Sequence, residues 1–230
     1  MNVHRRNAIA SMLSICGATF FRPAFGQDCS VGTIKEQQKI CLAALIEKRN
    51  MLITAKNAND SVLDMALGLI QPTVEVGEVV VALIRDCAVA KNPVPCGMAI
   101  LDIPDAIENI GTILTIVDSI KKRLREASAF RGAAKRGWHE QGGEDAMRKL
   151  YDCGFLDCFN VNVALDKYGD ELKAMIERNQ VKIDQFEKDL LELKSNLTRC
   201  AANQDDCAGL KEFTAPTLEG SQAPPEVVLP

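Results

Sequence analysis

The clearest pattern of apolar and polar positions lies in the last third of the chain. Apolar residues recur there every seven positions in two series offset by four, and Lys, Glu and Asp fill the flanks. The first series is Leu165, Leu172, Asn179, Phe186, Leu193 and Cys200, and the second is Ile176, Ile183, Leu190 and Leu197. The pattern predicts a helix over residues 165–200, ~54 Å long at ~1.5 Å per residue. Its seam faces either the other helices of the chain or, in a homodimer, a second copy, with Asn179 setting the register.

Two further segments have the polarity of amphipathic helices. Residues 31–56 place apolar side chains toward one side, and Ser30 is a suitable N-cap. The polar residues 57–61 predict a turn directly after this helix. Another helix is expected over residues 103–130, because Pro104 suits the first helical turn and cations gather near the end.

Between these two lies the most apolar part of the chain. Residues 62–89 are apolar on nearly all sides, which predicts the most buried helix. Pro72 lacks the N–H that its turn needs, so we expect a kink or break there. The β-branched residues 79–81 also suit a strand. Because short connections favour antiparallel neighbours, the sequence predicts an all-α, antiparallel bundle of about four long helices.

The segment 131–162 differs in composition from the helices on either side. It contains five glycines, the only Trp of the chain and several other aromatic residues, which predicts an irregular connection before the last helix. Aromatic loops on a rigid scaffold are common binding sites, although the same residues also suit a packed cover at the end of the bundle. The candidate binding residues are Trp138, His139, Tyr151 and Phe155. Residues 213–230 are rich in proline and are expected to be disordered.

Residues 1–26 have the features of a cleavable export signal. Arg5 and Arg6 precede a short apolar stretch, and small residues frame a cleavage site at 24–26. The arginine pair resembles a bacterial twin-arginine signal, and the general secretory route is the alternative. Residues 27–212 are then the helical domain of a periplasmic or secreted protein.

Charge narrows the range of partners. The first 26 residues contain three arginines and no acidic residue, so the mature chain has 24 basic and 31 acidic residues and a net charge of −7. An acidic surface argues against nucleic acid or an anionic membrane as a partner, because both require clustered cations. The mature chain has no uncharged run of 18 residues, so no membrane-spanning helix is expected.

Eight cysteines follow the predicted signal, and an even number behind an export signal indicates four disulfides. The cysteines are Cys29, Cys41, Cys87, Cys96, Cys153, Cys158, Cys200 and Cys207. If the first and last of four helices are antiparallel, the favoured pairs are Cys41–Cys200 and Cys29–Cys207. The alternative is local pairing, Cys29–Cys41 and Cys200–Cys207. Short spacing also favours Cys87–Cys96 and Cys153–Cys158.

Metal and cofactor chemistry finds little support in the sequence. There is no C-x-x-C pair, and His139 is the only histidine after the signal. Zinc fingers, c-type haem sites and Glu-x-x-His di-iron sites therefore lack the ligand spacing that they require. No metal site and no cofactor are expected.

These features favour a protein that acts by protein–protein contact, either as a structural or accessory component or as an inhibitor of a toxin. One alternative is a carrier of an apolar ligand, with Gly68, Gly77 and Gly111 allowing close approach to the apolar helices. The other is a cell-wall glycan hydrolase that uses Glu140 and Glu144. Since no nucleophile motif accompanies these acids, we do not expect catalysis.

Overall fold

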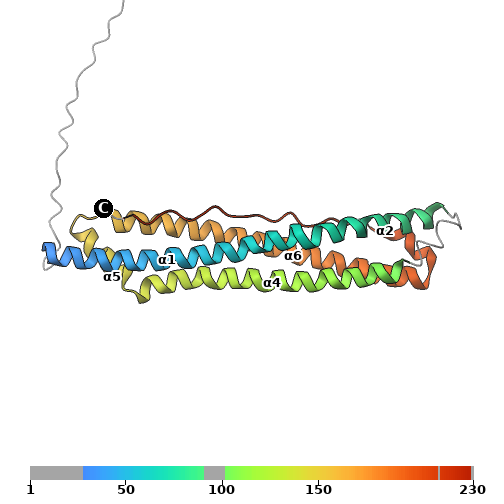
Figure 1. Ribbon diagram of the computed structural model, residues 1–230, viewed down its shortest axis with the longest axis horizontal. Coiled ribbons are helices and arrows are strands. Elements are labelled where there is room, and N and C mark those ends of the chain that lie inside the picture. Colours follow the sequence, from blue (N-terminus) through green and yellow to red (C-terminus); the bar gives the residue numbers. More distant parts are fainter. Residues whose placement is uncertain (1–27, 91–101, 212, 229–230) are drawn as a thin grey trace, which may run out of the picture.

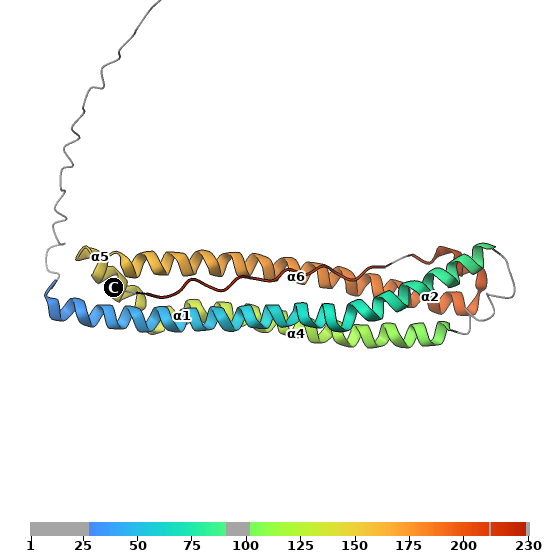
Figure 2. The ribbon, with the colours of Figure 1, turned by 45° about the horizontal axis from the view of Figure 1, so that its top comes forward.

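The protein is a long helical rod in the computed structural model, which describes residues 28–90, 102–211 and 213–228. Three long helical arms lie side by side, and the described residues contain no strand (Figures 1 and 2). The all-α, disulfide-stapled bundle expected from the sequence is confirmed. Its elements are α1 (Val31–Met65), η1 (Ala66–Ile70), α2 (Gln71–Ala90), α4 (Ile103–Glu140), α5 (Gly143–Asp152), α6 (Asp157–Ala202) and η2 (Gln204–Gly209).

The first arm is one continuous helical rod, so the prediction of a turn at residues 57–61 is wrong. The polar side chain of Asn59 is fully buried and hydrogen-bonded to groups far away in the sequence. It therefore does not compete for its own backbone, which is how Asn normally interrupts a helix. The arm extends over 31–90, ~90 Å at ~1.5 Å per residue.

Pro72 changes the helix locally without ending it. The five residues before Gln71 form a π-helical turn, in which the Gln71 N–H donates to the Ala66 carbonyl. This wider turn makes room for the proline ring, which would otherwise collide with a carbonyl of the preceding turn. Residues 79–81, for which a strand was the alternative, are helical.

The heptad pattern of α6 is confirmed as a buried seam. Asn179 and all nine apolar seam residues are at most 5% exposed, and they pack within the chain. The intrachain interpretation accounts for this burial. A homodimer through α6 stays a prediction, and it would have to use a face other than the seam.

The segment predicted to be irregular, 131–162, is mostly helical. α4 continues to Glu140, α5 follows after a short turn, and α6 begins at Asp157. A glycine inside a helix costs only about 1 kcal/mol, and burial of Ala134 and Trp138 on the same helix offsets this. Only Gly142 and Gly154, with φ of 72° and 85°, mark the two turns.

The disulfide map differs from the one favoured by the sequence. Cys29–Cys153 and Cys41–Cys158 join the start of α1 to the α5–α6 turn, and Cys200–Cys207 closes the end of α6. The predicted pairs Cys41–Cys200, Cys29–Cys207, Cys29–Cys41 and Cys153–Cys158 are wrong, and Cys200–Cys207 is confirmed. Cys96 lies outside the described residues, as do Cys16 and the predicted signal 1–26, so the pair Cys87–Cys96 is not described.

The number of arms explains this error. With three arms instead of four, the first and last run in the same direction, and the start of α1 lies beside the start of α6 (Figures 1 and 2). Four helices would have placed the start of α1 beside Cys200. The error at residues 57–61 therefore propagated to the disulfide map. The three disulfides among the described residues are typical of a protein from an oxidising compartment outside the cytoplasm.

Residues 213–228, expected to be disordered, form an extended strap along the rod (Figure 1). Phe213 is buried and packs against Gly77, where a Cβ would lie 3.0 Å from the ring. Farther along, the buried amides of Asn59 and Asn179 each donate to the Glu219 carbonyl, at 3.1 and 2.9 Å. The Glu219 N–H donates in return to Asn179. Sequence composition missed this order because the partners of the strap lie on distant helices.

The Glu219 side chain adds an electrostatic contact to the strap. Arg178 Nη2 and Lys182 Nζ lie 2.7 and 2.9 Å from its carboxylate. These hydrogen bonds, that of Arg178 first, lower the pKa of Glu219 to about 2. Beyond it, the Tyr168 hydroxyl donates to the Gln222 carbonyl at 2.7 Å.

Candidate functional site

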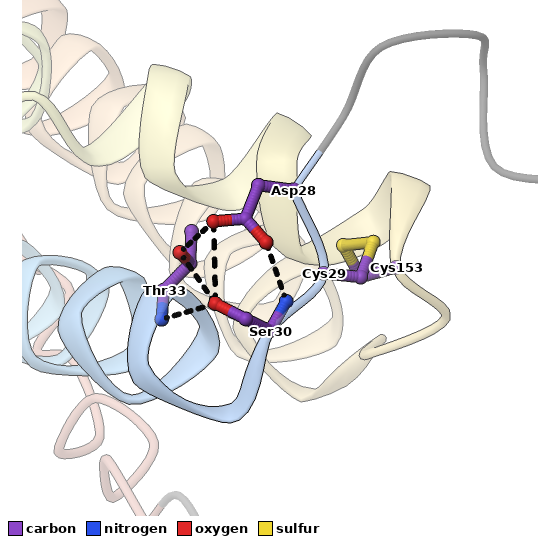
Figure 3. The surroundings of a disulfide bond; sticks show 5 residues. All are labelled: Asp28, Cys29, Ser30, Thr33 and Cys153. Atoms are coloured by element: carbon purple, nitrogen blue, oxygen red, sulfur yellow. Dashed lines mark hydrogen bonds between the residues drawn. A yellow bond between two sulfur atoms is a disulfide. The ribbon is translucent and has the colours of Figure 1, made fainter.

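The candidate site is built on the end of the rod where two disulfides lie close together. Asp28 and Ser30 hold the start of α1 there (Figure 3). The Asp28 carboxylate accepts hydrogen bonds from Thr33 Oγ1 at 2.7 Å and from the Ser30 N–H at 2.9 Å, and these bonds lower the pKa of Asp28, that from Thr33 most. The adjacent Cys29 is bonded to Cys153. The start of α1 and the α5–α6 turn are thus one covalently fixed unit, which we call the stapled end.

Large apolar side chains are exposed together on the stapled end. We call this group the aromatic patch; its members are 37–48% exposed. They are Tyr151, Phe155, Leu156, Phe159 and Val163. The rings of Tyr151 and Phe159 lie 5.8 Å apart between centroids. Val163 follows Phe159 by one helical turn, so both lie on one face of α6.

An open groove lies directly beside the aromatic patch. Its volume is about 610 Å³, and Tyr151 and Phe159 line it together with residues of α5 and the end of α4. His139 Nδ1 lies 2.7 Å from Glu144 Oε2 on one side of the groove. Hydrogen bonds from Lys149, and then from Arg148, lower the pKa of Asp145. The groove therefore combines aromatic walls with paired charges.

The structure brings three of the four candidate binding residues to this surface. Tyr151 and Phe155 belong to the aromatic patch, and His139 lines the groove. Trp138 is only 4% exposed and packs in the core beneath them, against Gly143. The binding role of these residues stays a prediction, and Trp138 would act in it by supporting the surface.

Sequence reasoning missed the remaining members of the aromatic patch. Leu156, Phe159 and Val163 precede the heptad pattern, which begins at Leu165, and lie outside its seam. Their spacing off the seam was the available signal. An amphipathic pattern indicates which face of α6 turns inward, so large apolar residues on the other face deserve a separate explanation.

A buried lysine marks a second, more polar cavity at the same end. Lys48 of α1 is only 3% exposed, and its Nζ lies 2.6 Å from Asn162 Oδ1 and 2.7 Å from Asp166 Oδ1. The Trp138 ring lies 5.4 Å away on another side. Burial lowers the pKa of Lys48, and the contact with Asp166 opposes this shift. The adjoining cavity, which we call the polar pocket, has a volume of about 320 Å³.

The structure shows neither a paired-carboxylate site at Glu140 and Glu144 nor an apolar cavity large enough for a lipid in the core between α2, α4 and α6. Glu144 is paired with His139, whereas Glu140 is exposed and lines neither the groove nor the polar pocket. An apolar cavity between α2, α4 and α6 measures about 150 Å³ and is bounded by Gly77 and Phe213. A cavity of this size holds a ligand such as benzene, which is much smaller than a lipid. The hydrolase and carrier hypotheses stay predictions without further support.

Metal-binding groups and membrane-spanning helices are the remaining candidates within the described residues. No group of three or more His, Cys, Asp or Glu residues there is arranged to hold a metal ion. By length and composition, the helix over Val31–Asp86 is apolar enough to cross a membrane. The sequence had not predicted this, because the mature chain has no uncharged run of 18 residues. The same helix contributes Val62, Ile70 and Val74 to the core of the rod.

Comparisons with known proteins add no relative: no protein-family model, no curated protein and no solved structure matches this chain significantly.

Proposed function

We propose that the protein is exported and acts by protein–protein contact, through the aromatic patch on its stapled end. The signal-like residues 1–26 and the three disulfides support the compartment. The long helices support a role in contact, because they hold the stapled end on a fixed scaffold.

The exposed aromatic patch is the observation that carries this proposal. Exposed apolar patches on soluble proteins mark interaction sites, and aromatic residues dominate the binding energy of protein interfaces. The patch lies on the segment that contains Cys153 and Cys158, both bridged to α1. Because these bridges fix the surface before binding, little conformational entropy is lost when a partner docks.

Charges around the patch suggest the complementary surface of the partner. Asp152 and Asp157 flank Phe155 and Leu156, and neither carboxylate forms an ion pair within the described part of the chain. A partner that fits would offer an apolar pocket with cations on its rim. An envelope protein that is held by the rod and a toxin that is inhibited by it both satisfy this chemistry.

Photo-crosslinking in the producing cells tests the proposal. A benzophenone amino acid replaces Phe155 in one variant and Leu191 in a control; Leu191 is 51% exposed on α6 and lies outside the patch. We expect one stoichiometric adduct from position 155 and none with that protein from position 191. Equal adducts from both positions, or none from position 155, would contradict the proposal.

A binding measurement with the captured protein follows. Phe155→Ser combined with Phe159→Ser should weaken the complex about 30-fold or more, since central aromatic contacts contribute about 2 kcal/mol or more. Leu191→Ser should leave the affinity unchanged. The activity of the partner, measured with and without the rod, distinguishes an inhibitor from an accessory protein. Unchanged affinity of the double variant would refute the role of the patch.

A further inference from the structure

The polar pocket has a basic wall on α4. Arg131, Lys135 and His139 line it and are spaced by four residues, so they lie one above another on one face of the helix. Trp138, on the adjacent face, contributes an apolar surface to the same cavity. Arg131 and Lys135 therefore make one side of the pocket positively charged over about one helical turn, and the His139 imidazole lies one turn farther along.

The opposite wall is acidic and comes from α6. Asn162, Asp166 and Asp170 line it, again spaced by four residues. α4 and α6 are antiparallel (Figure 1), and Arg131 Nη2 lies 2.6 Å from Asp170 Oδ1 at one end of the two walls. Lys48 reaches in from α1 and bonds to Asp166. The cavity thus lies between a basic and an acidic stripe.

One cation of this cavity has no partner. Among the charges lining the pocket, Asp166 is paired with Lys48, Asp170 with Arg131 and Glu144 with His139. Lys135 forms no ion pair or hydrogen bond within the described part of the chain, although it lies close enough to Lys48 to lower the pKa of that lysine. Lys48, Arg131 and Lys135 thus share the pocket with the carboxylates of Glu144, Asp166 and Asp170.

We propose that the polar pocket binds a small zwitterion of the free α-amino acid class, with its carboxylate between Lys135 and Lys48 and its ammonium against Asp166 and Glu144. Lys48 has three N–H donors, of which Asn162 and Asp166 occupy two. A carboxylate has about four acceptor sites, so Asp166 retains sites for an ammonium.

Charge balance favours a zwitterion over a simple ion. An anion alone would compete with Asp166 for Lys48, and a cation alone would compete with Lys48 for Asp166. Lys135 could balance an added anion, but that ligand would offer nothing to the acidic wall, and a cation alone would offer nothing to Lys135. A zwitterion satisfies both walls without breaking the existing pairs.

Size and surface restrict the ligand further. A volume of about 320 Å³ is at the lower end of the range for ligand sites, which suits one amino acid and excludes a longer peptide. Leu52, Trp138 and Met147 line the same cavity and offer an apolar surface to the ligand side chain. Leucine is therefore a suitable first probe.

Calorimetric titration of the disulfide-bonded protein tests this proposal with three probes. Leucine should bind. Leucinamide, which lacks the carboxylate, and N-acetyl-leucine, which lacks the ammonium, should each bind at least about tenfold more weakly. Absence of leucine binding at millimolar concentration, or equal binding of either derivative, would overturn the proposal.

A matched pair of variants places the binding in the pocket. Lys135→Gln changes an exposed residue without an ion pair, so the fold should be retained, and leucine should bind at least about tenfold more weakly. Lys122→Gln changes another exposed lysine of α4, outside the pocket, and should bind leucine as the original protein does. Equal affinity of the two variants would refute the assignment to this pocket.

Discussion

Cys29–Cys153 and Cys41–Cys158 connect the same two parts of the chain, so their contributions to stability should not be additive. Each bridge alone closes a long loop, with sequence separations of 124 and 117 residues. In the chain-entropy treatment, a loop of this length lowers the free energy of folding by about 5 kcal/mol. We propose removing the first bridge by Cys29→Ala with Cys153→Ala, because these two residues are only half-buried and alanine should leave no enclosed cavity.

The second bridge reduces the expected effect of this change. While Cys41–Cys158 is present, Cys29–Cys153 closes only the ring formed by residues 29–41 and 153–158, which are 19 residues in all, and this ring is worth about 3 kcal/mol. Removing one bridge should therefore lower the free energy of unfolding by about 3 kcal/mol, and removing both by about 8 kcal/mol.

Guanidinium unfolding followed by circular dichroism measures these free energies. The denaturant slope should rise in the variant without either bridge, because its unfolded chain expands and exposes more surface. Cys200–Cys207 provides a control because it closes a separate short loop. Its removal should lower the free energy of unfolding of every variant by the same amount, about 2 kcal/mol. Equal, additive losses of about 5 kcal/mol for the two long bridges would refute this reasoning.

Three further predictions concern single side chains. Gly143→Ala should destabilise the protein by about 1–3 kcal/mol and shift the fluorescence of Trp138 to longer wavelength, because a Cβ at position 143 overlaps the indole ring; unchanged emission would contradict the packing. The Glu219 carboxylate should stabilise the docked strap fully above its ordinary pKa of 4.5, and this stabilisation should be lost as the pH falls toward about 2. In limited proteolysis, Glu219→Gln should therefore remove this part of the acid sensitivity of the strap. Asp166→Ala should lower the free energy of unfolding, measured by thermal unfolding, by about 2 kcal/mol, because Lys48 stays buried without its carboxylate partner. Lys48→Met should lower it by less than about 1 kcal/mol, because the half-exposed Asp166 can be hydrated. The reverse order would refute the buried-charge explanation.

The parts of the fold that the sequence predicted correctly depend on local periodicity. The seven-residue repeat from Leu165 to Cys200 determines which face of α6 is apolar, and every seam position is buried. Pro72 determined where the first arm is irregular, because its missing N–H affects only its own turn. Composition alone suggested the candidates His139, Tyr151 and Phe155, and the structure exposes all three at the stapled end, where their binding role stays a prediction.

The parts that failed depend on contacts between distant residues. Asn59 indicated a turn in isolation, but Asn179 and the backbone of Glu219 satisfy its amide inside a helix. No local pattern reveals such a partner. Lys48 could not be recognised as buried for the same reason, because Asn162 and Asp166 lie more than a hundred positions away.

By itself, the sequence determined the helical class and the inward face of the last helix, and its even number of cysteines predicted the oxidising compartment that the disulfides indicate. The tertiary structure decided the number of arms, and with it the direction of α6, the disulfide partners and the end on which the aromatic patch is exposed. The physical reason is the sequence separation over which the deciding interactions act. Helix formation and amphipathicity depend on residues within a few turns, whereas direction and exposure depend on which distant surfaces cover each other.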